Sequence, residues 1–269
     1  MRLWFKKDDR FWVPKANLEV LLRTALVNAT PFTAVITKMC TELINDSLFE
    51  YSYDAAIAGL NYSVVRLSSG LQISVNGYSD RLLMLLEKVV ISMCSLEIKQ
   101  ARFDIIKERL LRALRNFEYQ EPYRQITAYR AWLSTRNTWA SHQLLAELPL
   151  VTTEDVSLFF PQVLRQLHIE ILVHGNLSTE EAFRSAHIIE AALQPRSFPS
   201  SQWDPTRNLL TPRGMDVLYQ RILQNASNTS HCVDYTIQIG DTQDRTLQAK
   251  LLLFAQVVEP LFDKLRTKE

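Results

Sequence analysis

The sequence predicts an α+β domain followed by a linker and the opening strands and helix of a second domain. Three observations predict this organisation. A β-hairpin pattern occupies residues 60–78, long amphipathic helices follow it, and a stretch rich in proline and serine interrupts the pattern at residues 194–214. Because hairpins and helices are segregated rather than strictly alternating, a doubly wound parallel sheet is disfavoured.

The composition is that of an ordinary globular protein. The chain has 269 residues, 47% of them hydrophobic and 22% charged, with a formal net charge of +1 at pH 7. A net charge so close to zero gives no overall field that would select nucleic acid or an anionic membrane. The longest apolar runs are too short to span a bilayer. We therefore expect neither nucleic acid nor membrane among the partners.

The first residues and the cysteines indicate the cytoplasm. The first twelve residues mix charges with aromatic side chains and lack the apolar core of a signal peptide. Cys40, Cys94 and Cys232 are widely spaced and form no CxxC pair. Such cysteines are typical of free thiols in a reducing compartment, so we expect a cytoplasmic protein.

Hydrophobic periodicity predicts the elements of the first part of the chain. Thr30 is a good N-cap and Pro31 fits the first helical position, while Ser79 or Asp80 caps a later helix. The predicted elements are a strand at 15–27, a helix from Pro31, a short helix at 48–58, a hairpin turning at 68–70, and helices at 81–94, 99–119 and 122–133.

The remaining elements set the domain boundaries. Thr152 and Asp155 form a capping box before a helix, a strand follows at 167–176, and a capped helix follows at 178–193. Beyond the linker we expect strands at 215–223 and 231–240 and a helix at 244–262. The expected domains are therefore 1–194, a linker at 195–208, and the start of a second domain at 209–269.

The residues by themselves predict no catalytic group and no metal ligand. The histidines His142, His168, His174, His187 and His231 form no HxxxH, HExxH or HxxEH pair. His168 and His174 flank one strand and point to the same face, but strand rise separates them by about 20 Å, so they cannot share a metal. We interpret them as ordinary strand-end histidines. No GxSxG and no phosphate-binding glycine loop is present.

Two surface features allow a binding or a structural interpretation. The helix at 99–119 carries basic residues from Arg102 to Arg115, which suit nucleic acid or carboxylates, or simply a solvated face. We favour the solvated face. The aromatic residues Trp4, Phe5, Phe11 and Trp12 suit a recognition surface or a cover for the edge of the first sheet, and we favour the cover.

Six stretches carry a resemblance to a known family. They are "LWFKKDDRFWVPKANLEV", "ELINDSLFEYSYDAAIAGLNY", "ISVNGYSDRLL", "RFDIIKERLLRALRNF", "LHIEILVHGN" and "EPLFDKLRTKE". In order and spacing, from end to end, they resemble the insulin-degrading enzymes of the pitrilysin-like M16 family of zinc metallopeptidases, the inverzincins.

The resemblance implies a fold of four homologous α+β domains, each with a mostly antiparallel sheet packed by long helices. The domains pair into two halves that close around a peptide, and the first domain carries the zinc motif HxxEH. This sequence resembles the third domain and the start of the fourth. Its counterpart of the zinc helix, "AVITKMCTELI", contains no histidine, and the region of Leu110, about where the helix of the third ligand would lie, has no matching histidine partner. We therefore expect no cofactor in this chain and zinc in the catalytic half.

The resemblance also implies two substrate-binding residues, Arg266 and Phe262. A family motif in the fourth domain reads Arg-Thr-Lys-Glu-Gln-Leu-Gly-Tyr, and this chain ends within it, at Glu269. In this interpretation Arg266 contacts the bound peptide near the scissile bond. The chain is accordingly expected to be a piece of a longer protein.

The expected function is that of the non-catalytic half of an insulin-degrading-enzyme-like zinc metalloendopeptidase. It forms part of the peptide-enclosing chamber and its substrate-binding wall, and it is inactive alone because it lacks HxxEH. The expected partners are peptide substrates and the N-terminal catalytic half, with a homodimer as one candidate assembly. The alternative is a metal-free M16-like scaffold or interaction protein, like the respiratory-complex core subunits. A nucleic-acid module on the basic helix is a third interpretation.

Overall fold

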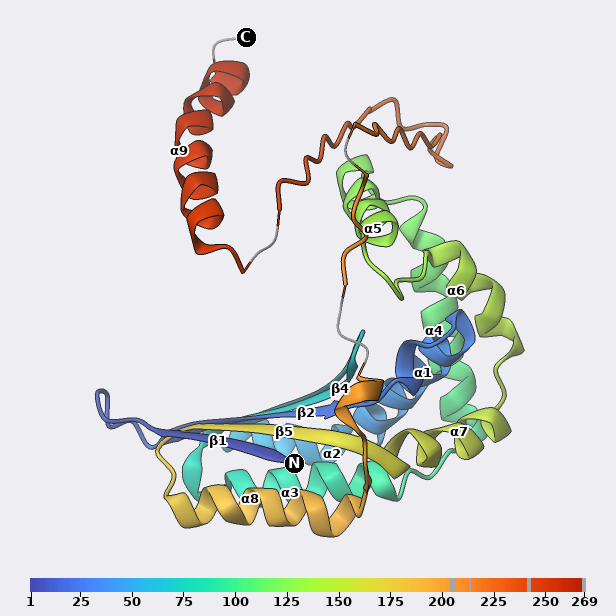
Figure 1. Cartoon of the computed structure of the whole chain (residues 1–269). Helices are drawn as coiled ribbons and strands as arrows, with labels where there is room; N and C mark the ends of the chain where they lie inside the picture. The colour runs from blue at the N-terminus through green and yellow to red at the C-terminus, as the bar shows by residue number, and fades with distance from the viewer. Residues whose placement is uncertain (204–206, 213, 241–242, 268–269) are drawn as a thin grey trace. The chain divides into compact units, whose positions relative to one another are not determined.

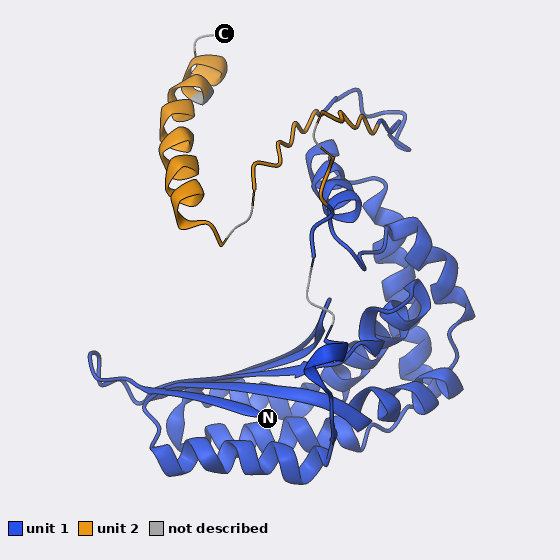
Figure 2. Ribbon diagram, in the orientation of Figure 1, with its two compact units in different colours: residues 1–209, 220–232 blue, residues 210–219, 233–269 orange. Residues whose placement is uncertain are grey.

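The computed structural model describes residues 1–203, 207–212, 214–240 and 243–267 (Figure 1). These residues form two compact units, shown in different colours in Figure 2. The first unit comprises Met1–Leu209 and Gln220–Cys232, and the second comprises Leu210–Tyr219 and Val233–Glu269. The first unit contains the sheet and most of the helices.

The first unit is built on a mixed, mostly antiparallel sheet. The strand order is β1 (Arg2–Lys7), β5 (Gln166–Gly175), β2 (Lys15–Arg23), β4 (Gly70–Tyr78) and β3 (Leu60–Leu67), and a short β6 (Arg196–Ser197) also pairs with β5. Strands β5, β2, β4 and β3 are joined by antiparallel pairs, whereas β1 and β6 run parallel to β5. The α+β prediction is therefore confirmed.

One face of the sheet forms the core because apolar residues alternate along each strand. On β2, the buried residues Ala16, Leu18, Val20 and Leu22 alternate with exposed or half-buried ones. The same core includes residues of α1 (Pro31–Ser47), α3 (Ser79–Cys94) and α8 (Thr179–Leu193). Helices α3 and α8 lie under this face of the sheet in Figure 1, and in the described part of the first unit no α-helix lies over the opposite face.

Local hydrogen bonds start three helices where the sequence predicts them. At α1, Thr33 N donates to Thr30 Oγ1 (3.1 Å) and Thr30 N donates to Thr33 Oγ1 (3.0 Å). Reciprocal pairs of the same kind join Thr152 with Asp155 before α7 (Thr153–Arg165), and Ser178 with Glu181 before α8. These caps are confirmed because each needs only residues three positions apart.

The start of α3 differs from the prediction. The helix begins at Ser79, so Tyr78 occupies the N-cap position and neither Ser79 nor Asp80 caps the helix with its side chain. The antiparallel pairing of β4 extends to Tyr78, which pairs with Lys15, and the helix follows without a connecting loop. Sheet pairing thus sets the helix start, which the local sequence could not reveal.

The basic helix is α4 (Gln100–Phe117), and its charges are largely engaged within the first unit. Arg109 Nη2 lies 2.6 Å from Glu42 Oε2, and Arg102 forms an ion pair with Asp46, so two ion pairs join α4 to α1. Hydrogen bonding from Arg102 lowers the pKa of the Asp46 carboxyl. Lys107 Nζ donates to the carbonyls of residues 149 and 151 at 2.8 and 2.7 Å. The basic face therefore has an intramolecular role, which leaves less of it for an external polyanion.

The aromatic start of the chain forms the sheet edge instead of covering it. Residues 2–7 are strand β1, parallel to β5. Phe5 packs against the core, whereas Trp4 is 61% exposed and Phe11 is 79% exposed. Trp12 is also exposed, with a positive φ of 53°. The predicted cover is therefore wrong, because an edge strand buries only one of its faces.

The two strands predicted at 215–223 and 231–240 are absent. Within the described residues of 215–240, none belongs to a strand. Residues 220–232 instead belong to the first unit, where Arg221 Nη2 lies 2.9 Å from Glu118 Oε2 and the guanidinium lies over the ring of Tyr129. A two-stranded hairpin that pairs with no other strand is only marginally stable in water. The alternation of apolar and polar residues was therefore not sufficient to predict a hairpin in this segment.

Three other helices follow the predicted order, namely α2 (Phe49–Ile57), α5 (Pro122–Ser134) and, in the second unit, α9 (Arg245–Thr267). A further helix, α6 (Ser141–Glu147), was not predicted. Asp244 Oδ1 accepts hydrogen bonds from the backbone N–H groups of Thr246 and Leu247 and caps α9. Helix α9 is longer than predicted because it continues beyond residue 262 to Thr267.

Much of the predicted linker at 195–208 contacts the first unit. Residues of β6 extend the sheet at β5, Phe198 is buried, and Leu209 N donates to the carbonyl of Ser134 (2.7 Å). Trp203 Nε1 donates to the carbonyl of Phe198 (3.1 Å). The described part of this segment is therefore anchored at several points along its length.

One-sided burial of the sheet predicts unequal effects of two leucine truncations. Leu18 is fully buried on β2, and Leu172 lies on the opposite face of neighbouring β5 and is 45% exposed. Leu18→Ala should lower the free energy of unfolding by about 2–5 kcal/mol, because it leaves a cavity in the core. Leu172→Ala should cost less than about 1 kcal/mol. Urea unfolding followed by circular dichroism measures both, and equal losses would contradict the assignment of the faces.

Candidate functional site

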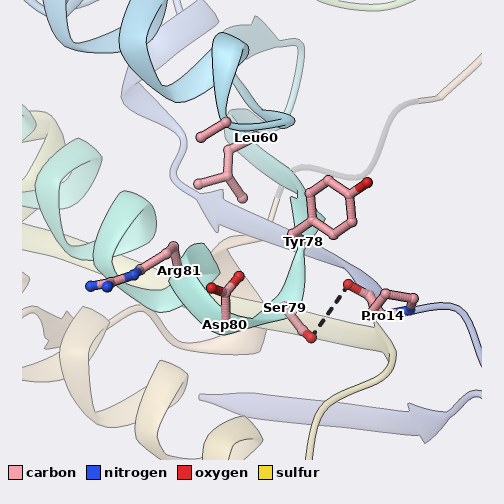
Figure 3. Close-up of a pocket in the computed structure, with 7 residues that line it drawn as sticks. Pro14, Leu60, Tyr78, Ser79, Asp80 and Arg81 are labelled. Atoms are coloured by element: carbon pink, nitrogen blue, oxygen red, sulfur yellow. Dashed lines mark hydrogen bonds between the residues drawn. The ribbon is translucent and has the colours of Figure 1, made fainter.

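A surface pocket lies at the start of α3 (Figure 3). It has a volume of about 380 Å³, and its lining residues are Pro14, Ala58, Leu60, Tyr78, Ser79, Asp80 and Arg81. Ser79 closes one side by donating its N–H and its hydroxyl to the carbonyl of Pro14, at 3.1 and 3.5 Å. Tyr78 and Arg81 point in opposite directions in Figure 3. The lining groups offer no nucleophile beside a base, so the pocket has no evident catalytic chemistry.

The second candidate is the sheet face that the helices leave uncovered, which we call the open face. Strand register places its side chains in rows across the sheet. One row consists of His174, Asn17, Asn76 and Asn61, contributed by β5, β2, β4 and β3. Asparagine is depleted in strands, so three in one row are unusual for a purely structural surface.

A hollow of about 240 Å³ lies on the open face beside this row. Its lining includes the side chains of Trp4, Glu19, Leu21, Leu67, Gln72, Glu170 and Leu172. Trp4, Leu172, Glu19 and Ser74 are consecutive partners across β1, β5, β2 and β4. Register therefore brings an aromatic ring, an aliphatic side chain and a carboxylate to neighbouring positions.

The two carboxylates of the hollow have different partners. Glu19 Oε2 accepts hydrogen bonds from Gln72 Nε2 (2.8 Å) and from the Ser74 hydroxyl. Glu170 Oε2 lies 3.3 Å from Arg23 Nη2, and its Oε1 lies 3.3 Å from His168 Nε2. Glu170 is thus paired with basic side chains, whereas the partners recorded for Glu19 are neutral.

His168 lies at one end of the open face in a partly desolvated position. Its ring stacks on Trp203 with 4.1 Å between centroids, and Arg2 and Arg23 lie 5.8 and 5.9 Å from the Trp203 centroid. Nε2 faces Glu170 without forming a hydrogen bond. Burial lowers the pKa of His168, as do the charges of the terminal amino group and Arg2, while Glu170 opposes the shift.

The predicted substrate-binding residues lie together on α9. Arg266 is exposed in the last turn, and Phe262 lies four positions earlier, which places both on one side of the helix. The side chain of Phe262 is outside the described part of the structure. Because α9 belongs to the second unit, these residues and the open face are separate candidate sites.

The helix expected to match a zinc helix does not fit a metal. In α1, Met39 and Cys40 are fully buried in the hydrophobic core. Burial raises the pKa of the Cys40 thiol, which disfavours the thiolate that zinc would bind. Among all described residues, no three His, Cys, Asp or Glu side chains are grouped closely enough to hold a metal ion. His168 and His174 stand at opposite ends of β5, on one face as predicted.

Sequence reasoning did not find Glu19 or the asparagine row, and it interpreted Trp4 as part of a cover for the sheet edge. A partial signal was present, because Asn17 and Glu19 are polar positions on one side of a strand whose other side is apolar. The remaining members come from strands far apart in the sequence. Their assembly depends on the strand order, which alternation within one strand does not define.

Comparison with known proteins places this fold in a peptidase family. A family model described as "Middle or third domain of peptidase_M16" matches residues 1–147. The chain belongs to the M16 peptidase family. The pitrilysin crystal structure has the same fold, with a TM-score of 0.68 and 20% sequence identity over 74% of this chain and 21% of that one. The predicted pitrilysin-like fold is therefore confirmed.

Two relatives are similar in sequence to this chain over its whole length. A Schizosaccharomyces pombe protein whose name describes a zinc protease is 35% identical over 270 residues, which is 100% of this chain and 28% of that protein. The Homo sapiens insulin-degrading enzyme is 34% identical over 273 residues, which is 100% of this chain and 26% of that enzyme. The predicted relationship to the insulin-degrading enzymes is thus confirmed, and the chain spans about a quarter of their length.

In the described segments, no helix combines the length and the apolar character that crossing a bilayer requires.

The lowered pKa of His168 predicts a loss of stability in weak acid. Protonation favours the unfolded chain, so the free energy of unfolding should fall as the pH drops below about 6.5, the usual histidine value. His168→Gln should flatten this dependence between about pH 7 and pH 5. The control is His187→Gln, which changes an exposed histidine of α8. Urea unfolding at several pH values measures the slope, and an unchanged slope in His168→Gln would rule out this role.

Proposed function

We propose that this chain is a metal-free part of an M16 zinc metalloendopeptidase and contributes to the wall of the chamber that encloses the peptide. The observation that carries the proposal is the match to a third M16 domain in a chain whose helix α1 contains no histidine. In this proposal α1 stabilises the core, and zinc and HxxEH come from the N-terminal half of the same enzyme.

The open face supports a role as a wall. Its amide row and its adjoining hollow expose hydrogen-bonding and apolar groups side by side within the first unit. Asparagine side chains carry the donor and acceptor groups of a peptide bond. A peptide backbone can therefore be bound there without a charged partner for each of its polar groups.

The second unit supports the assignment of a further domain. Several large apolar residues of α9 are exposed, namely Leu252, Leu253, Phe254, Val257, Leu261 and Leu265. An apolar surface of this kind is typical of a helix that packs against other elements. We propose that 1–194 is the third domain, 195–208 the connection, and 209–269 the opening of the fourth domain.

Cysteine use supports a cytoplasmic enzyme. Cys40, Cys94 and Cys232 are all free thiols, as expected in a reducing compartment. A homodimer is a candidate assembly, and light scattering of the purified chain would reveal it. The peptidase role requires in addition a complex with a catalytic half.

Reconstitution tests the proposed function directly. The 269-residue chain alone should hold no stoichiometric zinc and cleave no peptide, because its described residues offer no metal-binding group. Mixed with an N-terminal half that contains HxxEH, it should form a complex and raise peptide hydrolysis above that of the half alone. Elemental analysis and a fluorogenic peptide assay measure these quantities.

Two results would contradict the proposal. One tightly held zinc per isolated chain, with hydrolysis lost to a chelator, would show a catalytic centre in this chain. A stable complex whose peptide binding and hydrolysis equal those of the half alone would instead favour the metal-free scaffold.

Substitution of Arg266 tests the proposed substrate contact. A guanidinium that donates to a peptide carbonyl forms a charge-assisted hydrogen bond worth about 1.5–3 kcal/mol. In the complete enzyme, Arg266→Ala should therefore lower kcat/KM roughly 10- to 150-fold and leave the zinc content unchanged. Arg266→Lys should restore only part of the loss, because an ammonium lacks the planar fork of donors.

Lys264→Ala is the matched control, since Lys264 is another basic residue of the last turn of α9. It should leave kcat/KM near the parent value. Phe262→Ala should raise KM if Phe262 contacts the same peptide. A normal kcat/KM for Arg266→Ala, with a lowered Tm, would assign Arg266 to helix stability through the helix dipole instead.

A further inference from the structure

We propose that the hollow on the open face is a subsite for a basic side chain of an extended peptide, with Glu19 as its anionic partner. The proposal rests on the peptide-binding role proposed above and names the kind of side chain that the wall selects. Its elements are one unneutralised carboxylate, one aromatic wall and the neighbouring amide row.

The charge distribution within the hollow favours a cation at Glu19. In the described part of the chain, no basic side chain forms an ion pair with Glu19, whose hydrogen bonds come from Gln72 and Ser74. Both of those bonds reach Oε2, and a carboxylate can accept about four. Glu170 differs because Arg23 and His168 already lie 3.3 Å from its two oxygens. Glu19 is therefore the carboxylate of the hollow that is available to pair with an ammonium or guanidinium group of a bound peptide.

The walls of the hollow suit the aliphatic part of a lysine or arginine. Trp4 and Leu172 are 61% and 45% exposed, and they pair with each other across β1 and β5. Leu172 also pairs with Glu19 across β5 and β2, so the apolar wall adjoins the carboxylate. Long basic side chains bury their methylene groups on apolar surfaces, and an indole ring attracts a nearby cation. The hollow of about 240 Å³ accommodates one such side chain.

Neutral side chains are disfavoured at this position for a physical reason. A norleucine side chain would fill the same space, but it would remove water from Glu19 without supplying a positive charge. Desolvation of an unpaired carboxylate is costly. Selectivity thus arises from an unfavourable contact with the wrong side chain as well as from a favourable contact with the right one.

The amide row gives the rest of the peptide its hydrogen bonds. Asn17 is two residues from Glu19 on β2, and Asn76 is two residues from Ser74 on β4. The row therefore runs about 7 Å from the hollow by strand rise. A peptide that crosses the strands can place its backbone along this row while one side chain enters the hollow.

Binding of four matched peptides to the 269-residue chain tests the proposal. The probes are Ac-Gly-Val-Thr-Xaa-Thr-Val-Gly-NH2 with lysine, arginine, norleucine or glutamine at Xaa, measured by isothermal titration calorimetry. The lysine and arginine peptides should bind roughly threefold to tenfold more tightly than the neutral ones. Glu19→Gln should remove this preference, because it keeps the shape and deletes the charge.

Two further variants complete the design. Glu190→Gln changes an exposed glutamate of α8 and should keep the full preference. Trp4→Ala should weaken binding of the lysine and arginine peptides, and the 61% exposure of Trp4 leaves folding little dependent on that ring. Circular dichroism of each variant shows that it is folded. Should Glu19→Gln not fold, Trp4→Ala decides whether the hollow is used.

The outcomes separate the subsite from the wider peptide-binding role. Equal affinity for all four peptides, or a preference that survives in Glu19→Gln, would overturn the subsite and leave the peptide-binding role standing. Failure of every peptide to bind would overturn both. A preference for basic peptides that is lost in Glu19→Gln and kept in Glu190→Gln would support the subsite.

Discussion

Burial of a single face of the sheet is the constraint on which the rest of the structure depends. Leu18, Val20 and Leu22 point into the core from β2, and Ile171 and Val173 do so from β5. The strong preference of these side chains for an apolar environment fixes the register of each strand, since a shift by one residue would expose the whole set. Helices α3 and α8 are consequently held on one side, and the opposite side carries both polar residues and partly exposed apolar ones.

The same constraint determines how helix α1 is held in the fold. Helix α1 packs its apolar face into the core, and its acidic residues Glu42 and Asp46 pair with Arg109 and Arg102 of α4. These contacts stabilise the helix pair without any ligand. A helix whose inner face is filled by Met39 and Cys40 has no room for a hydrated cation and gives it no favourable partner. The relationship to the M16 family is therefore visible in the architecture of the sheet and its helices.

Differences in pairing give the open face its chemical character. Arg23 pairs with Glu170, and His168 lies between Glu170 and the Trp203 ring, so that end of the face is a closed network. Glu19 lies in the adjoining row with neutral partners, beside the exposed ring of Trp4. Of these two regions of the described open face, the second combines charge with accessible apolar surface. The combination is what distinguishes a binding surface from a solvated sheet face.

The sequence by itself determined the features that depend on near neighbours. Thr30, Thr152 and Ser178 cap helices through residues three positions away, and the hairpin at 60–78 and helix α9 follow from local periodicity. Six stretches were also sufficient to identify the family. Tertiary structure decided the rest. Residues 2–7 became an edge strand and 215–240 did not form strands, because strand formation depends on available partners. The hollow beside Glu19 likewise required β1, β5, β2 and β4 to lie in one order, which only packing of the whole core selects.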